Sequence, residues 1–225
     1  MSAGEVPRRI DVRGEPASDV ALEALVEHVR GGGVLVHPTE TVYGFGSRAH
    51  GEGLERLRAL KDLPVDRPVL LLVPDRRSVE GLAWNASARR LERAFWPGSV
   101  TLLLSDPDRT FPEGVRSRAG AVGVRRTAHP LTARLVEALG EPLTSTSANA
   151  PGGAPARDGE TAFDVAWALG GGPRTWVLDV GALPPSAAST IVDCTGAVPR
   201  IVRAGATPVE SLRRLLPEID DFRGT

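Results

Sequence analysis

The sequence predicts one α/β domain of the α+β type, in which helices flank a mixed β-sheet. Its 225 residues suit one large domain. Hydrophobic residues make up 41% of the chain and charged residues 24%, which are ordinary values for a globular protein. Short apolar runs typical of strands are mixed with segments of helical periodicity without strict alternation, which argues against a barrel or a doubly wound fold.

Helices are predicted from apolar spacing and from the residues that start or stop them. In residues 18–30, apolar side chains recur at i, i+3, i+4 and i+7, and three glycines follow. Pro130 begins another helix, which Gly140 ends. A capping box from Thr207 to Glu210, with proline at the first helical position, predicts the start of the last helix. The remaining helices are expected at residues 54–61, 87–95 and 162–169.

Strands are predicted where short apolar runs lie between turn residues. Residues 69–73 are all aliphatic, so we expect this strand to be buried on both faces. Residues 37–44 are expected to form a polar loop. The other strands are expected at residues 34–36, 100–104, 121–125, 143–147, 176–179, 190–193 and 200–203.

Charge, cysteine content and hydropathy exclude several classes of protein. The formal net charge of -1 argues against a whole-surface grip on nucleic acid, and the single cysteine, Cys194, forms no internal disulfide. Residues 1–13 lack the apolar core of a signal peptide, and the longest aliphatic run is too short to span a bilayer. We therefore expect a cytoplasmic protein without a membrane partner.

Metal sites and the common catalytic motifs are not indicated. The four histidines are scattered without ligand spacing, and one cysteine cannot build a thiolate metal site. The sequence has no Walker phosphate loop, no G-x-G-x-x-G after a strand and no G-x-S-x-G elbow. Candidate sites must therefore come from other polar clusters.

Three small polar residues end one predicted strand. Alternate side chains of an extended segment share a face, so Ser145, Ser147 and Asn149 are expected to point together. Their hydrogen-bonding groups suit a phosphate or a carboxylate, or they cap a turn.

Three cations are further candidates. Of the 27 Lys and Arg residues only Lys61 is lysine; it either complements the dipole at a helix end or binds phosphate as a compact charge. Arg125 ends a strand of small apolar residues, where a charge needs either an internal carboxylate or a bound anion. Arg203 raises the same choice.

Seven stretches occur in the order typical of one known family. They are residues 32–46 (GGVLVHPTETVYGFG), Lys61, and residues 95–102 (FWPGSVTL), 122–125 (VGVR), 146–149 (TSAN), 189–193 (STIVD) and 201–205 (IVRAG). Together they resemble the YrdC/TsaC family of threonylcarbamoyl-AMP synthases, over roughly residues 15–216. We expect residues 1–225 to form a single domain of this kind, the family's single-domain form.

The resemblance implies a fold, a reaction and partners. The fold would be a twisted, mixed and largely antiparallel sheet flanked by helices, with one concave electropositive site. The reaction would be an ATP-dependent nucleotidyl transfer that makes threonylcarbamoyl-AMP from L-threonine, bicarbonate and ATP, with Mg²⁺ accompanying ATP. The product would serve tRNA modification, which implies downstream tRNA-modification proteins as partners and makes tRNA or double-stranded RNA candidate partners.

The resemblance also implies roles for nine residues. Those implied to bind the threonine substrate are Thr41, Arg125, Ser145 and Ser189, with Arg125 on its carboxylate. Those implied to meet the nucleotide are Lys61, Arg67, Ser147, Asn149 and Arg203, of which Lys61, Ser147 and Asn149 are the implied catalytic groups. In one departure from the family, Leu63 stands where an arginine is usual. The side chain of Arg67 is expected to occupy the position of that missing arginine.

Two alternatives remain open at the level of sequence. One is a non-catalytic RNA-binding paralogue with a basic patch formed by Arg116, Arg118, Arg125 and Arg126. The low aromatic content of 4% weakens it, since few side chains could stack on bases. The other is a paralogue that acts on a different amine or acid.

Overall fold

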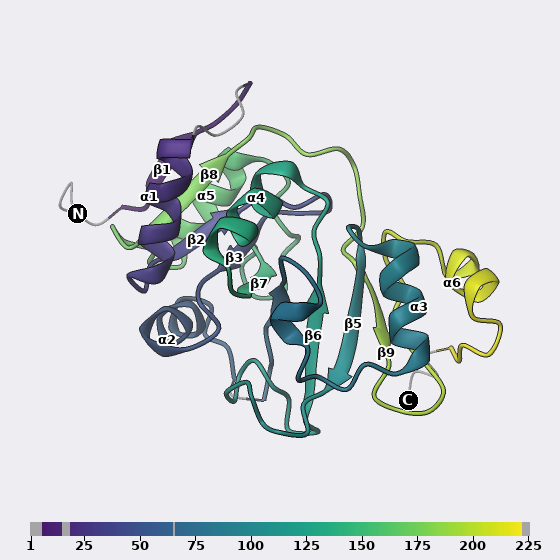
Figure 1. The fold of residues 1–225 in the computed structure, drawn as a ribbon. Helices are drawn as coiled ribbons and strands as arrows, with labels where there is room; N and C mark the ends of the chain where they lie inside the picture. The colour runs from purple at the N-terminus through teal and green to yellow at the C-terminus, as the bar shows by residue number, and fades with distance from the viewer. Residues whose placement is uncertain (1–5, 15–18, 65, 222–225) are drawn as a thin grey trace.

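The computed structural model describes residues 6–14, 19–64 and 66–221, and it has the predicted α/β architecture (Figure 1). The helices are α1 (Asp19–Arg30), α2 (Gly51–Leu60), the 3-10 turn η1 (Arg77–Val79), α3 (Ala86–Phe95), α4 (Pro130–Leu139), α5 (Gly159–Ala168) and α6 (Val209–Leu215). The strands are β1 (Arg8–Asp11), β2 (Val34–His37), β3 (Gly44–Gly46), β4 (Leu70–Leu72), β5 (Val100–Ser105), β6 (Ala121–Arg125), β7 (Leu143–Ser147), β8 (Thr175–Asp179), β9 (Thr190–Asp193) and β10 (Arg200–Arg203).

The strands form one ten-stranded sheet in the order β1-β8-β2-β3-β7-β4-β6-β5-β9-β10. Its pairings are mixed: five are antiparallel and four are parallel. The sheet therefore confirms the mixed, largely antiparallel topology and differs from a doubly wound fold, whose strands are mostly parallel.

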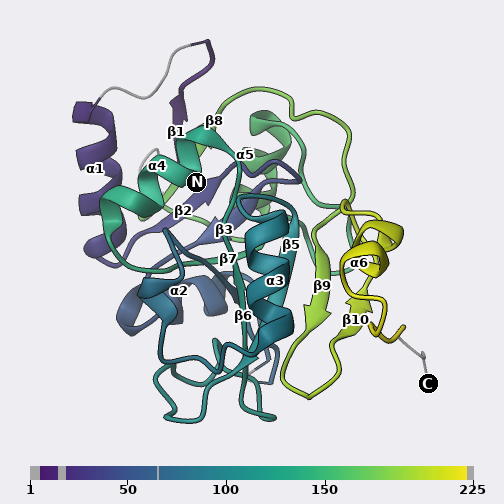
Figure 2. The ribbon, with the colours of Figure 1, turned by 45° about the vertical axis from the view of Figure 1, so that its right-hand side comes forward.

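Helices α1 and α4 lie side by side and cover only part of one sheet face (Figure 2). Beneath them, a cluster of buried apolar side chains includes Leu35, Leu178, Leu143 and Leu72, one from each of four strands. Side chains two positions away on the same strands, such as Ser145 on β7 and Leu70 on β4, lie on the same face but line an open cleft. The helical layer thus stops partway across the sheet.

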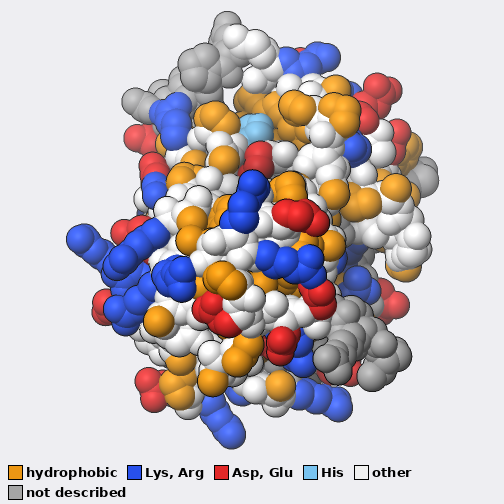
Figure 3. Space-filling view, turned by 90° about the vertical axis from the view of Figure 1, so that its right-hand side faces the viewer, with side chains coloured by type: hydrophobic (Ala, Val, Ile, Leu, Met, Phe, Trp, Pro, Cys, Tyr) orange, Lys and Arg blue, Asp and Glu red, His pale blue; other side chains and the backbone are white. Residues whose placement is uncertain are grey.

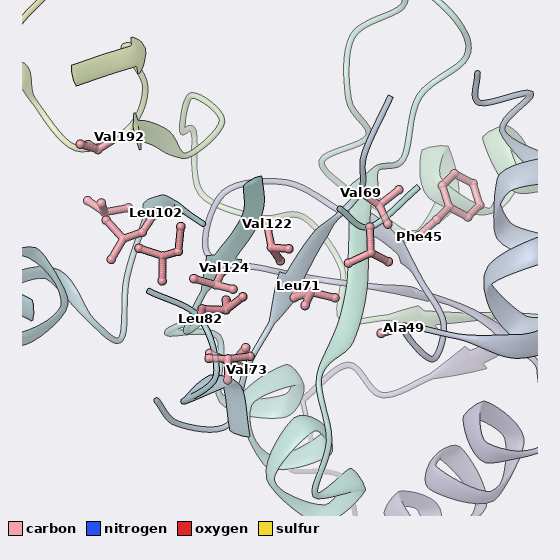
Figure 4. Close-up of a cluster of buried hydrophobic side chains, with 14 of the residues drawn as sticks. Phe45, Ala49, Val69, Leu71, Val73, Leu82, Leu102, Val122, Val124 and Val192 are labelled. Atoms are coloured by element: carbon pink, nitrogen blue, oxygen red, sulfur yellow. The ribbon is translucent and has the colours of Figure 1, made fainter. Parts of the chain in front are cut away.

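The opposite sheet face carries the larger core (Figure 4). Val122 and Val124 on β6 and Leu102 on β5 point into it, and all three are completely buried. Helices α2, α3, α5 and α6 add apolar side chains to the same cluster. One face of the central strands is therefore closed by packing, which leaves the other face available for a site.

The structure refines several predicted boundaries. Helix α2 begins at Gly51 rather than 54, and α5 begins at Gly159, after an Asp158 side chain that accepts a bond from Thr161 N. The predicted start of the first helix at Ser18 falls outside the described residues. The prediction of a capping box at the last helix was wrong. The N-cap is Pro208, and the Thr207 hydroxyl is bonded to Ser99 Oγ at 2.8 Å instead of capping the helix.

Two strands were not predicted. Strand β1 is polar and pairs in parallel with β8, where Arg9 donates to the buried carboxylate of Asp179. Strand β3 is three residues long and falls within and just after the predicted polar loop. No helix in the described part of the chain is long and apolar enough to cross a membrane.

We expect Gly46→Ala to destabilise the fold by about 1–3 kcal/mol, since overpacking of a dense core costs about this much. Strand β3 runs so close to β7 that a Cβ at Gly46 would lie 2.7 Å from the carbonyl oxygen of Thr144. Urea unfolding measures the change. The matched control is Gly196→Ala, where the nearest atom is 3.7 Å away; equal stability of the two variants would contradict the close-approach argument.

Candidate active site

A cleft of about 370 Å³ opens on the sheet face that α1 and α4 leave uncovered. Its floor includes Thr101 and Leu103 of β5 and Gly123 of β6, alternate residues that point to one side. Its walls come from the loop after β2, from β7, from the connection between β8 and β9, and from β10. The charged residues among those that line it are all arginines: Arg67, Arg125 and Arg203.

The cleft brings together most of the predicted site residues. Those that line it are Thr41, Arg67, Arg125, Ser145, Ser147, Ser189 and Arg203. Lys61 and Asn149 do not line it, but both contact Ser147. The Lys61 ammonium donates to the Ser147 carbonyl at 3.1 Å, and the Ser147 hydroxyl donates to Asn149 Oδ1 at 2.6 Å. Of the three residues predicted to point together, Ser145 and Ser147 line the cleft, whereas Asn149 lies in the turn that follows the strand.

The loop after β2 is held rigid by Thr39. Its hydroxyl accepts bonds from the backbone N–H groups of Thr41 and Val42, each at 3.1 Å, and donates to the Val42 carbonyl at 2.7 Å. The Thr39 and Thr41 hydroxyl oxygens also lie 2.9 Å apart, within hydrogen-bonding distance. The Thr41 oxygen is therefore held in position by the same loop.

Arg125 has an internal carboxylate partner, which answers one question that the sequence left open. Its Nη2 lies 2.8 Å from Oε1 of Glu40, and its side chain is only 4% exposed. Glu40 also accepts from the Thr127 hydroxyl at 2.6 Å. Burial acts to raise the pKa of Glu40, but the charge of Arg125 and the bond from Thr127 outweigh it, so the net pKa is lowered and the carboxylate stays ionised.

The Arg125 guanidinium also reaches the cleft wall. Its two Nη atoms lie 3.4 and 3.5 Å from Thr41 Oγ1. Burial lowers the pKa of Arg125 and Glu40 opposes that shift, yet an arginine keeps its charge throughout the physiological range. Arg125 thus presents a desolvated, oriented cation beside a fixed hydroxyl, an arrangement suited to a carboxylate.

On the opposite wall, Arg203 is fixed to Ser189. Its Nε and Nη2 donate to the Ser189 carbonyl at 3.1 and 2.8 Å, and Nη2 also donates to the Ser189 hydroxyl at 3.2 Å. That hydroxyl is 2.9 Å from Thr101 Oγ1. Burial and the charge of Arg125, which lines the same cleft, lower the pKa of Arg203. Unlike Arg125, Arg203 has a neutral internal partner, so its charge is not cancelled there.

Lys61 follows α2 as its C-cap and is 7% exposed. Its ammonium donates to the carbonyls of Ser147 and Asn149 and lies 3.2 Å from Asn149 Oδ1. Burial, with a contribution from the charge of Arg67, lowers the pKa of Lys61 to about 8. Among the described residues, the ammonium donates only to neutral oxygens, so its positive charge is not cancelled behind this wall of the cleft.

Asn149 and the connection between β8 and β9 complete the frame. The Asn149 amide donates to the carbonyls of Ala150 and Gly153, so it caps the turn as well as contacting Lys61. The Tyr43 hydroxyl donates to Gly181 O at 2.9 Å and accepts from Val180 N at 3.1 Å, which ties the start of that connection to the loop after β2.

Comparison with known proteins agrees with this architecture. Residues 27–205 match the model of the Sua5/YciO/YrdC family, described as telomere recombination. The chain belongs to the Sua5/YciO/YrdC family. A Mycobacterium tuberculosis protein is 35% identical over 192 residues, 84% of this chain and 85% of that protein. The threonylcarbamoyl-AMP synthase of Stenotrophomonas maltophilia is 36% identical over 144 residues, 62% of this chain and 77% of its own.

A solved structure of a family member shares the fold. The crystal structure of Pyrococcus abyssi Sua5 complexed with L-threonine has a TM-score of 0.85 and 26% sequence identity to this chain. The match covers 95% of this chain and 62% of that one, so this chain spans less than two thirds of the archaeal Sua5.

Within this family fold, the structure also shows residues that the sequence reasoning missed. Glu40, which orients Arg125, and Thr39, which fixes Thr41, were quoted within the 32–46 stretch but given no role. Their positions in the sequence could have indicated a role, because a carboxylate and a hydroxyl lie directly before Thr41, a predicted substrate-binding residue. Leu63 is partly buried against the larger core, and Arg67 lines the cleft. That Arg67 takes the place of the family's arginine at position 63 stays a prediction.

The basic patch of the RNA-binding alternative does not form as proposed. Arg116 lies beside Val122 near the start of β6, whereas Arg125 is the last residue of that strand and Arg126 follows it. The stretch of strand from Val122 to Arg125, at about 3.3 Å per residue, therefore separates Arg116 from Arg125. Arg125 is buried with Glu40, and Arg126 is 3.3 Å from Glu137. On the face that carries α3 and α6, basic and acidic side chains are interspersed (Figure 3).

Histidine chemistry contributes little to the site. His37 is completely buried, and burial lowers its pKa to about 4, so it is neutral at pH 7. Among the residues that the structure describes, no group of three or more His, Cys, Asp or Glu side chains comes together to hold a metal ion.

Anion binding next to Lys61 is expected to weaken as the pH rises through about 8, because the ammonium loses its proton above that pH. Titration with inorganic pyrophosphate on either side of pH 8 measures this. The control is Lys61→Arg, which stays charged and experiences the same titration of pyrophosphate itself. An identical loss of affinity in both proteins would show that Lys61 is not the titrating group.

Proposed function

We propose that this chain is a threonylcarbamoyl-AMP synthase, which makes threonylcarbamoyl-AMP from L-threonine, bicarbonate and ATP. The observation that carries the proposal is the distribution of cations around the cleft. Arg67, Arg125 and Arg203 line the cleft, and Lys61 contacts Ser147 directly behind its wall. Four cations around one cleft suit a ligand set with two anionic groups, a carboxylate and a polyphosphate. The names of the relatives and the threonine complex of Sua5 support the assignment.

The threonine carboxylate is assigned to Arg125, with Thr41, Ser145 and Ser189 around the rest of the amino acid. Arg125 is buried and oriented by Glu40, so little conformational entropy is lost when a carboxylate binds. Thr41, Ser145 and Ser189 supply hydroxyl groups on the same cleft. Hydroxyls both donate and accept hydrogen bonds, which suits the ammonium and hydroxyl groups of threonine.

The reaction joins three molecules and requires no acid/base pair from the protein. The threonine ammonium first loses a proton to solvent, and the free amine then adds to bicarbonate and forms a carbamate with loss of water. A carbamate oxygen then attacks the α-phosphorus of ATP, the bond from that phosphorus to the bridging oxygen breaks, and pyrophosphate leaves. The protein's contribution is to hold these anions together and to offset their charge.

The nucleotide phosphates are assigned to Lys61, Arg67, Ser147, Asn149 and Arg203, and Mg²⁺ enters with ATP as part of the substrate. Among the described residues, the Lys61 ammonium donates only to neutral oxygens and is partly desolvated, so a phosphate would gain a strong interaction there.

The product would pass to tRNA-modification proteins in the cytoplasm. Direct binding of tRNA or double-stranded RNA is not favoured, because the basic residues expected to form its surface are separated and partly paired.

Pyrophosphate release from ATP, Mg²⁺ and bicarbonate is expected to depend on L-threonine. Lys61→Ala should reduce the rate about 100-fold or more, the effect of removing one preorganised charge-stabilising group. A coupled pyrophosphate assay with and without threonine measures both. Release driven by another amino acid would instead identify a paralogue with a different substrate, and the absence of release from folded protein would refute the synthase assignment.

Arg125→Gln is expected to raise the KM for threonine by about 10- to 100-fold, which corresponds to about 1.5–3 kcal/mol for a charged hydrogen bond. The KM for ATP should change much less. Because this variant leaves Glu40 buried without its partner, Glu40→Gln with Arg125→Gln is tested beside it. The control is Arg126→Gln, whose guanidinium pairs with Glu137 outside the cleft. A threonine KM unchanged in both Arg125 variants would contradict the assignment.

A further inference from the structure

Arg67 is placed at the cleft by a segment whose described residues form few hydrogen bonds with one another. The chain turns sharply after Lys61, since Asp62 has a left-handed φ of 45°. Beyond this turn, the Arg67 loop, defined as residues 62–64 and 66–68, leads to β4. Arg67 N donates to Pro64 O at 2.9 Å, and Leu63 N donates to Arg58 O at 3.0 Å. Such a loop needs a further restraint to hold one side chain in place.

The side chain of Arg58, in the last turn of α2, supplies that restraint. Its Nη1 donates to Arg67 O at 3.2 Å and to Gly114 O at 3.0 Å. Its Nη2 donates to Leu63 O at 3.2 Å and also to Pro64 O. One guanidinium thus bonds four carbonyl oxygens, three of them in the Arg67 loop. Only an arginine offers this many donors in a planar, rigid group.

The fourth carbonyl connects the loop to the sheet. Gly114 O also accepts from Val69 N at 2.8 Å, directly before β4. Gly114 has φ 86°, and a Cβ there would lie 2.5 Å from Arg58 Nη1, so the absence of a side chain at this position makes room for the guanidinium. Arg58 is therefore built into the frame next to the cleft, although it does not line the cleft itself.

The Arg67 guanidinium itself has no acidic partner among the described side chains, and it lies near enough to Lys61 to act on that ammonium. Two like charges repel, so the surrounding structure must hold them if they are to stay close together. We propose that Arg58 is a positioning residue, which holds Arg67 at the mouth of the cleft beside Lys61 so that both cations contact the phosphates of one nucleotide. This inference rests on the proposed function, because it takes the polyphosphate of ATP as the ligand.

A double-mutant cycle separates positioning from simple destabilisation. Arg58→Met is expected to weaken ATP binding about tenfold, equivalent to about 1.4 kcal/mol. In the Arg67→Met background, Arg58→Met should cause no further loss, because the guanidinium that it positions is already gone. Equal losses in both backgrounds, or no loss in either, would overturn the proposal. The matched control is Arg56→Met on the same helix, whose guanidinium donates to Gly32 O instead.

The sole lysine provides a second measurement that needs no turnover. The pH dependence of Lys61 acylation, followed by mass spectrometry, gives the pKa of this one side chain. Arg58→Met should raise that pKa above the value of about 8, since the charge of Arg67 moves away, and Arg56→Met should leave it unchanged. An unchanged pKa in Arg58→Met would also overturn the proposal. If Arg58→Met fails to fold, Arg58→Lys, which keeps the charge but loses the planar group, is measured in its place.

These two readouts distinguish failure of the inference from failure of the proposed function. ATP binding and the Lys61 pKa are measured without threonine. If both respond to Arg58→Met while the wild type releases no pyrophosphate with threonine, the positioning role stands and the synthase assignment falls. If the wild type is active but neither readout responds, the synthase assignment stands and the role of Arg58 falls.

Discussion

The site depends on one geometric constraint, the alternation of side chains along the central strands. Val122 and Val124 of β6 enter the larger core, so the residues between and beside them must face the other way. On that other face, the layer formed by α1 and α4 stops over Leu72 and Leu143. The next residues on the same strands, Leu70 and Ser145, therefore line a cleft instead of a core. The cleft is the part of a packed sheet face that no helix covers.

The same constraint explains how the protein keeps cations where it does. A charged group near a core must be hydrogen-bonded, and three of the four cations at or beside the cleft have internal partners. Arg125 has a carboxylate, Arg203 and Lys61 have backbone carbonyls, and the loop of Arg67 is held by another arginine. Carbonyls orient a cation without cancelling its charge. The positions of these cations are thus fixed before any ligand binds, which is the preorganisation that anion recognition requires.

Most elements could be predicted from the sequence because their signals are local. Apolar periodicity located α1 and α4, and the aliphatic run at β4 located a buried strand. The failures have physical reasons. Strand β1 is polar because it pairs along the side of β8, where Arg9 and Asp179 stabilise it, so no apolar pattern marks it. Strand β3 is too short for a periodic signal. At α6, Thr207 bonds to Ser99, a residue distant in sequence, and tertiary contact prevailed over the local capping motif.

The sequence by itself determined the residue types of the site and their order along the chain, because a buried strand end, a lone lysine and a run of small hydroxyl side chains are local features. Tertiary structure alone decided how these residues combine. Lys61 and Ser147 are far apart in sequence and meet only because β3 and β7 pair antiparallel next to α2. That Glu40 lies within ion-pair distance of Arg125 likewise depends on the fold around the cleft, which the spacing of these residues along the sequence does not encode.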